Sequence, residues 1–126
     1  MEASSCAVSS SAGRVFFSGD DSRDVYSFKT AERTVPPTFS VFGEATDYVT
    51  GLAVYVGKSS DYLLVAQSDT VDVYSTKFKL LGSMKITGVE DAEIQGLSIY
   101  QGKTKQYSGG VLAFAIEYEE IGRAHV

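Results

Sequence analysis

The chain has few of the residues on which several kinds of protein chemistry depend. It holds one cysteine, Cys6, and one histidine, His125, among its 126 residues. A single cysteine forms no internal disulfide, and a lone cysteine is usually a small buried hydrophobe, so we expect Cys6 in the core. His125 falls in a tail that we interpret below as non-native. No Ser-His-Asp triad, Cys-His pair or zinc cluster is available, which excludes acyl transfer and zinc chemistry.

Basic residues and long apolar runs are scarce as well. Eleven Lys and Arg stand against sixteen Asp and Glu, for a formal net charge of -5. A chain without a basic stripe is a poor partner for nucleic acid, whereas an acidic chain suits calcium. No run approaches the roughly 18 apolar residues of a membrane helix, and the start of the chain lacks the regions of a signal peptide. We therefore expect neither nucleic acid nor a membrane as partner.

What the chain does contain favours strands. Eight Tyr, seven Phe, twelve Gly and only two Pro accompany many Val, Thr and Ser, and 44% of the residues are hydrophobic. β-branched and aromatic side chains pack well on a pleated sheet, and Gly suits tight turns. No stretch shows sustained helical periodicity, so the sequence predicts an all-β fold with essentially no helix.

A repeat of about 45 residues organises the chain. The segment Gly51–Lys58 (GLAVYVGK) returns 45 residues later as Gly96–Lys103 (GLSIYQGK). Two weaker similarities lie upstream. Ser5–Val8 resembles residues 51–54, which lie 46 positions later, and Asp24–Ser27 is repeated as Asp72–Ser75, 48 positions later. Three units therefore begin near residues 5, 51 and 96.

Each complete unit predicts four short strands. In the first unit these are near residues 6–9, 14–18, 25–29 and 38–42, and in the middle unit near 52–56, 62–66, 71–74 and 80–86. Four strands in about 45 residues are typical of a propeller blade. We expect a partial β-propeller of about three four-stranded antiparallel blades, near residues 5–45, 46–90 and 91–120, with the last blade cut short after a strand over 110–118. A β-sandwich is the alternative, but it does not require this repeat.

Several segments taken together carry a resemblance to a known family. They are Ser4–Cys6, Gly13–Phe17 with Asp20-Asp21 and Val25–Phe28, Tyr48–Tyr55, Tyr62–Asp69, Gly82–Ile86 and Gln95–Ser98. In order and spacing, over about residues 2–118, they resemble the carboxyl-terminal part of the β-propeller phytase domain. Members of that family are six-bladed, usually secreted 3-phytases, which hydrolyse phosphomonoesters of phytate (inositol hexakisphosphate) with the help of calcium.

The chain differs from this family at the positions of the family's calcium ligands. The resemblance places family carboxylates at five positions where this chain has neutral side chains: Ser4, Tyr48, Thr50, Gln95 and Ser98. In the family, such carboxylates hold several calcium ions, which neutralise the substrate phosphates and activate a water. Neutral hydroxyls and amides do not offset the dehydration of a hard divalent cation. We therefore expect the catalytic calcium cluster to be weak or absent.

Four acidic residues still match the family's ligand positions or lie near them. They are Asp20, Asp21, Asp69 and Glu117, and they are weak candidates for holding one calcium ion, the cofactor that the resemblance implies. The alternative, which we favour, is that the aspartates in Gly-Asp-Asp-Ser and Ser-Asp-Thr stabilise turns through side chain to backbone hydrogen bonds. No catalytic residue is assigned.

Three further features have simple interpretations. Glu90–Glu93 is an acidic stretch that either replaces missing ligands or, in the interpretation we favour, is a solvated loop. Lys58 and Lys103 occupy equivalent positions in the repeat. They either belong to hairpin turns, the interpretation we favour, or contact a phosphate. The clustered serines lack a base and are expected to mark a turn: they are Ser4, Ser5, Ser9, Ser10 and Ser11.

The ending Glu120–Val126 (EIGRAHV) is similar to the translation of a short-read sequencing adapter. We therefore expect the partial propeller to span residues 1–120 and residues 120–126 to be a non-native tail. Open sheet edges predict poor solubility or self-association of such a fragment.

The sequence thus predicts an inactive fragment of a phytase-like protein with degenerate catalytic motifs. The alternatives are a non-catalytic scaffold or binding module, an auxiliary domain beside an intact phytase domain, and an enzyme that stays active through ligands from further blades. Expected partners are phytate or another phosphorylated small molecule and the remaining blades of the same domain.

Overall fold

The computed structural model describes residues 3–31, 38–88, 92–102 and 110–118, and within these ranges it contains strands and turns but no helix. The prediction of an all-β fold is therefore confirmed. None of the described residues forms a helix that is long and apolar enough to cross a membrane. The predictions for Glu90, Asp91, Lys103 and the tail from residue 120 lie outside the described residues.

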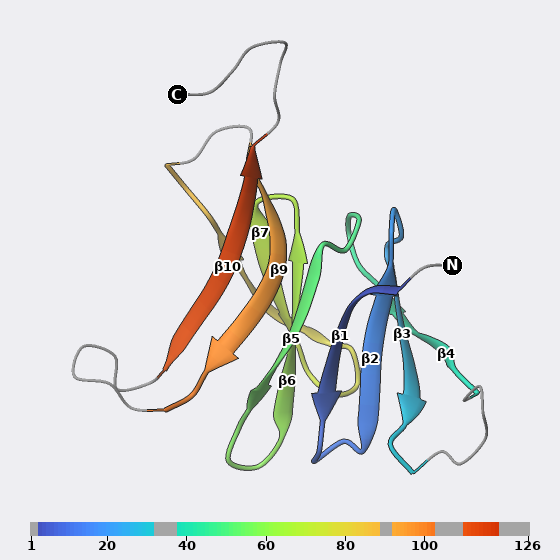
Figure 1. The fold of residues 1–126 in the computed structure, drawn as a ribbon. Helices are drawn as coiled ribbons and strands as arrows, with labels where there is room; N and C mark the ends of the chain where they lie inside the picture. Colours follow the sequence, from blue (N-terminus) through green and yellow to red (C-terminus); the bar gives the residue numbers. More distant parts are fainter. Residues whose placement is uncertain (1–2, 32–37, 89–91, 103–109, 119–126) are drawn as a thin grey trace.

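In the described part of the chain, ten strands form three antiparallel sheets (Figure 1). The first sheet has the order β1 (Ala3–Ser9), β2 (Arg14–Gly19), β3 (Asp24–Lys29) and β4 (Ser40–Glu44). The second has the order β5 (Gly51–Val56), β6 (Asp61–Gln67), β7 (Thr70–Tyr74) and β8 (Leu80–Lys85). The third pairs β9 (Ala92–Tyr100) with β10 (Val111–Tyr118). The described strands thus lie where the hydrophobic pattern predicts them.

The first strands of the three sheets lie side by side. β1 contacts β5, β5 contacts β9, and in Figure 1 all three run in the same direction. The sequence repeat therefore corresponds to a repeated innermost strand, followed in two sheets by three strands in simple up-and-down order. This is how successive blades are arranged in a propeller, and none of the three sheets closes into a barrel. The prediction of a partial propeller agrees with this architecture.

The core consists of two layers, one on each face of the second sheet. Alternate residues of a strand point to opposite faces, so β6 supplies side chains to both layers. The layer between the first and second sheets contains Phe16, Val25, Ala45, Val49, Leu52, Leu63, Val65 and Tyr74. The layer between the second and third sheets contains Leu64, Ala66, Val71 and Ile94, against which Leu97, Ile99, Leu112 and Phe114 pack. The second sheet therefore holds the other two together.

Cys6 is exposed, which corrects the expectation of a buried thiol. Its neighbours in β1 face the second sheet: Ser5 Oγ accepts a hydrogen bond from the Leu52 N–H at 2.9 Å, and Ala7 packs against the core. Because side chains alternate along a strand, Cys6 points to the opposite face.

A buried hydrogen bond links the first and second sheets at the far end of β1. Ser9 Oγ donates to Asp61 Oδ2 at 2.6 Å, and both residues are almost fully buried. Hydrogen bonds lower the pKa of Asp61: the one from Ser9 has the largest effect, and those from Ser11 and the Gly57 backbone add to it, against desolvation, which raises it. The expectation that the clustered serines mark a turn is correct for Ser10 and Ser11 only, since the other three lie in β1.

The lowered pKa of Asp61 makes stability depend on pH. A carboxyl group whose pKa is lower in the folded state stabilises the fold fully above its unfolded pKa of about 4, and this contribution is lost as the pH falls through the folded pKa. We expect the free energy of unfolding, measured with urea between pH 7 and pH 2, to fall more steeply on acidification for the wild type than for Asp61→Asn. Equal slopes would contradict this role of Asp61.

The backbones of the second and third sheets are in contact at two glycines of the repeat. A Cβ at Gly51 would lie 2.9 Å from the carbonyl carbon of Gly96. Gly96 itself has a φ of +81° and is the extra residue opposite the irregularity between Phe114 and Ala115 of β10. Its N–H donates to the Thr50 carbonyl at 3.0 Å. Both glycines are therefore required by backbone geometry.

A methyl group at Gly51 should force the two sheets apart. We expect Gly51→Ala to lower the free energy of unfolding by about 1–3 kcal/mol, the usual cost of overpacking. The matched control is Gly82→Ala, since a Cβ at Gly82 meets no atom within 4 Å. Urea denaturation of both variants checks the prediction, and a Gly51→Ala protein as stable as the control would show that the sheets are not in close contact.

Candidate functional site

A cavity of about 500 Å³ lies at the end of the molecule where the innermost strands begin. Its walls come from all three sheets and from the hairpins and connections at that end. The lining residues are Ser4, Asp20, Asp21, Asp47, Tyr48, Val49, Thr50, Ser68, Glu93, Gln95 and Gly96. A cavity of this size is within the range of small-molecule sites, about 300–1,000 Å³.

Strand direction brings these distant segments together. β1, β5 and β9 run in the same direction, so residues at or just before their starts share one end of the molecule (Figure 1). In an antiparallel sheet the hairpin between the second and third strands returns to that same end. The hairpins with Asp20 and Asp21 and with Ser68 therefore meet the starts of the innermost strands.

Six positions that the family resemblance singled out line this one cavity, and Glu93 of the acidic stretch Glu90–Glu93 lies in β9 and lines it as well. Four are places where the family resemblance expects carboxylates and this chain has neutral side chains, and two are the acidic pair. They are Ser4, Tyr48, Thr50 and Gln95, with Asp20 and Asp21. These residues are up to 91 positions apart in the sequence, from 4 to 95, so their convergence is a property of the fold.

The other predicted ligands are placed differently. Ser98 and Asp69 are not among the lining residues. The Asp69 carboxylate lies 3.7 Å from Lys85 Nζ, and its carbonyl accepts the Ile86 N–H, so Asp69 belongs to the turn that joins β6 to β7. Glu117 lies in β10, but its side chain is outside the described part of the chain.

The structure also shows where Asp21 and Lys58 lie, two of the residues for which turn roles were expected. Asp21 has a φ of +52° in the hairpin between β2 and β3, a backbone position that aspartate tolerates better than most residues. This agrees with a turn role for Asp21 and still leaves it in the cavity wall. Lys58 is exposed just beyond the other end of β5, so it does not reach the cavity.

The sequence analysis missed the residues that support the cavity wall. Gln67, 1% exposed, accepts hydrogen bonds at Oε1 from Thr46 Oγ1 at 2.8 Å and from the Asp47 N–H at 2.9 Å. Its Nε2 donates to Asp72 Oδ2 at 2.7 Å, and Ser83 Oγ donates to Asp72 Oδ1. A buried polar chain thus runs from β8 to the connection before β5. No local sequence motif identifies these residues, and only their contacts in the structure show their role.

The cavity is acidic and polar. Carboxylates of Asp20, Asp21, Asp47 and Glu93 line it together with hydroxyl and amide groups, and no Lys or Arg is among its described lining residues. Asp47 Oδ1 is already bonded to the Tyr48 N–H at 2.7 Å. Within residues 3–31, 38–88, 92–102 and 110–118, no three Asp, Glu, His or Cys side chains are grouped closely enough to hold a metal ion. This donor set does not fit a cluster of several calcium ions.

The buried amide of Gln67 should be required for stability. Gln67→Leu removes three hydrogen bonds and leaves the buried Asp72 carboxylate with one partner fewer, so we expect a loss of about 2–4 kcal/mol in the free energy of unfolding. Thr46→Val removes one bond at an exposed residue and is expected to cost less than about 1 kcal/mol. Urea denaturation measures both losses, and equal losses would show that the amide is not the centre of the network.

Comparisons with known proteins do not identify the chain. The chain matches no model of a known protein family, and no curated protein matches it.

Proposed function

We propose that the chain is a phytase-like propeller segment that binds a phosphorylated small molecule, phytate in the first instance, with little or no hydrolysis. The observation that carries the proposal is the convergence of Ser4, Asp20, Asp21, Tyr48, Thr50 and Gln95 on one cavity. The family resemblance was drawn from linear segments, and six of its site positions meet in space. They meet at the end of the molecule where the innermost strands begin, which is where a ligand site shared by several strands can form.

The charge of the cavity determines how a phosphate ligand enters it. Four carboxylates line the cavity, and the chain carries a formal net charge of -5. A bare polyphosphate is repelled by such a surface, since like charges interact unfavourably across a few ångströms. Calcium between carboxylate and phosphate oxygens removes this repulsion, because it accepts six to eight oxygen ligands from either source. The ligand proposed is therefore the calcium complex of phytate, with calcium as part of the ligand.

The neutral side chains argue against catalysis. In the family, carboxylates at the positions of Ser4, Tyr48, Thr50 and Gln95 would keep several ions in place, and here these positions offer hydroxyl and amide groups. Such groups contact a phosphorylated ligand by hydrogen bonds but leave the developing charge of a phosphoryl transfer unbalanced. Binding is thus retained and hydrolysis is lost.

The proposal predicts binding of phytate that requires calcium, without release of phosphate. Isothermal titration calorimetry with phytate should give a signal in calcium buffer and none in EDTA, and myo-inositol should give none in either. We expect Asp20→Asn/Asp21→Asn to weaken binding by about tenfold or more, since charge-assisted contacts contribute about 1.5–3 kcal/mol. Asp69→Asn, outside the cavity, is the control and should bind as the wild type does.

A phosphate-release assay on the same samples separates the alternatives. Calcium-dependent release of phosphate from phytate would overturn the loss of hydrolysis and support an active enzyme. If neither binding nor release is observed, the chain is a propeller scaffold and the proposed function is wrong.

A further inference from the structure

Tyr48 differs in kind from the other residues of the cavity wall. It is 54% exposed, whereas most of the described lining residues offer carboxylate, hydroxyl or amide groups. Val49, the apolar residue next to it, also lines the cavity but is 3% exposed and belongs to the core between the first and second sheets. Tyr48 therefore presents the one exposed aromatic ring among the described lining residues of a polar cavity.

Hydrogen bonds hold the backbone on both sides of Tyr48. The residue before it is bonded to the buried polar network described above. The Val49 N–H donates to the Ser22 carbonyl of the first sheet at 2.9 Å. The Thr50 N–H donates to the Ala66 carbonyl of the second sheet, also at 2.9 Å. The backbone at Tyr48 is therefore fixed before a ligand arrives, and little ordering is needed when the ring forms a contact.

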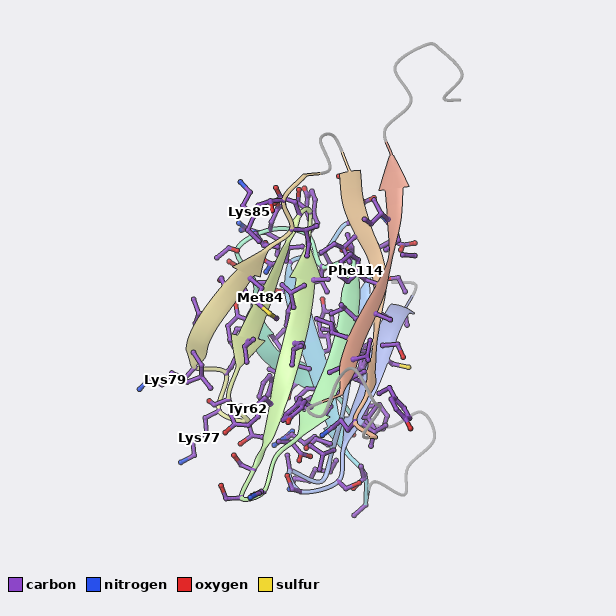
Figure 2. All side chains as sticks on the ribbon, turned by 90° about the vertical axis from the view of Figure 1, so that its left-hand side faces the viewer. Tyr62, Lys77, Lys79, Met84, Lys85 and Phe114 are labelled. Atoms are coloured by element: carbon purple, nitrogen blue, oxygen red, sulfur yellow. The ribbon has the colours of Figure 1, made fainter. Side chains whose placement is uncertain are left out.

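Basic side chains do not distinguish one phosphorylated ligand from another in this cavity, since its described wall contains none. Lys85 of β8 lies nearest in the fold, beside the hairpin that joins β6 to β7, but its Nζ is 3.7 Å from Asp69 Oδ2. Lys77 and Lys79 lie at the opposite end of β8 (Figure 2). Calcium contacts phosphate oxygens whatever carries them. A preference for one carbon skeleton therefore requires a contact with the skeleton itself.

An aromatic ring provides such a contact. Its face carries partial negative charge, so it attracts the slightly positive C–H groups of a saturated ring and does not attract phosphate oxygens. A cyclic polyol phosphate such as phytate has C–H groups on both faces of its ring. A linear polyphosphate such as tripolyphosphate has no C–H group. The two ligands thus offer the same phosphate chemistry to calcium but differ in what they offer to Tyr48.

We propose that Tyr48 determines the specificity of the cavity, giving it a preference for cyclic polyol phosphates over linear polyphosphates. This inference rests on the proposed function, because it concerns the ligand of the same cavity. Calcium and the carboxylates bind the phosphate groups, and the Tyr48 ring packs on the C–H face of the ligand. The family resemblance expects a carboxylate at this position. The tyrosine therefore replaces a contact with calcium by a contact with the carbon skeleton.

The ratio of two affinities tests this role. Isothermal titration calorimetry in calcium buffer gives the Kd of phytate and the Kd of tripolyphosphate for each variant. Tyr48→Ala should weaken phytate binding by about threefold to tenfold, the range expected for one aromatic contact, and leave tripolyphosphate binding unchanged. Tyr48→Phe keeps the ring and should keep the wild-type ratio. Tyr100→Ala, which removes a tyrosine that is 59% exposed and lies outside the cavity lining, is the matched control.

Saturation-transfer NMR gives a second readout that does not depend on affinity ratios. Saturation of the aromatic protons of the protein should reach the C–H protons of bound phytate in the wild type and in Tyr48→Phe. It should be strongly reduced in Tyr48→Ala, while Tyr100→Ala behaves as the wild type does. Partial unfolding of a variant lowers the binding of both ligands equally, so it leaves the affinity ratio unchanged.

The possible failures are distinguishable. If Tyr48→Ala changes the binding of both ligands by the same factor, or leaves phytate binding as it is, Tyr48 does not determine specificity, and the proposed function still stands. If the wild type binds neither ligand in calcium buffer, the proposed function is wrong and this inference is wrong with it.

Discussion

The backbone contact between β5 and β9 is the constraint on which the site depends. The absence of a side chain at Gly51 allows the two strands to approach, and the φ of +81° at Gly96 favours a glycine there. The Gly96 N–H donates to the Thr50 carbonyl at 3.0 Å. Thr50 and Gly96 are themselves lining residues of the cavity. The contact between the second and third sheets therefore fixes the part of the cavity wall where the two sheets meet. A larger residue at either glycine would change the site and the core together.

The cavity wall is held from behind by a polar network rather than by apolar packing alone. Gln67 connects the segment with Thr46 and Asp47 to the buried Asp72. A buried carboxylate is tolerated when its oxygens are bonded, and here Gln67 and Ser83 provide those bonds. Because such a network is satisfied in one arrangement only, it fixes the connection before β5 and, with it, the position of Tyr48 and Thr50.

Most of the fold is predictable because it follows from local periodicity. The repeat of Gly51–Lys58 at Gly96–Lys103 predicts equivalent innermost strands, and alternation predicts which residues share a face. The orientation of Cys6 was not predictable, since alternation alone leaves open which face of β1 meets the next sheet. Gln67 and Asp47 escaped prediction because their bond joins residues 20 positions apart without a motif. The convergence of Ser4 and Gln95 follows from the repeat as well as from the resemblance, since each residue stands directly before the start of a repeat unit.

The cavity and the exposed face of the first sheet that carries Phe39 arise from the same arrangement but use different parts of it. In a stack of sheets both faces of each inner sheet are apolar, so an open stack displays an apolar face at its end. Burying a side chain such as Phe39 contributes about 1.5–3 kcal/mol, which favours covering that face. The cavity, in contrast, is formed by strand ends and hairpins. A further sheet that packed on that face would therefore leave the strand ends uncovered and the acidic cavity open to a ligand.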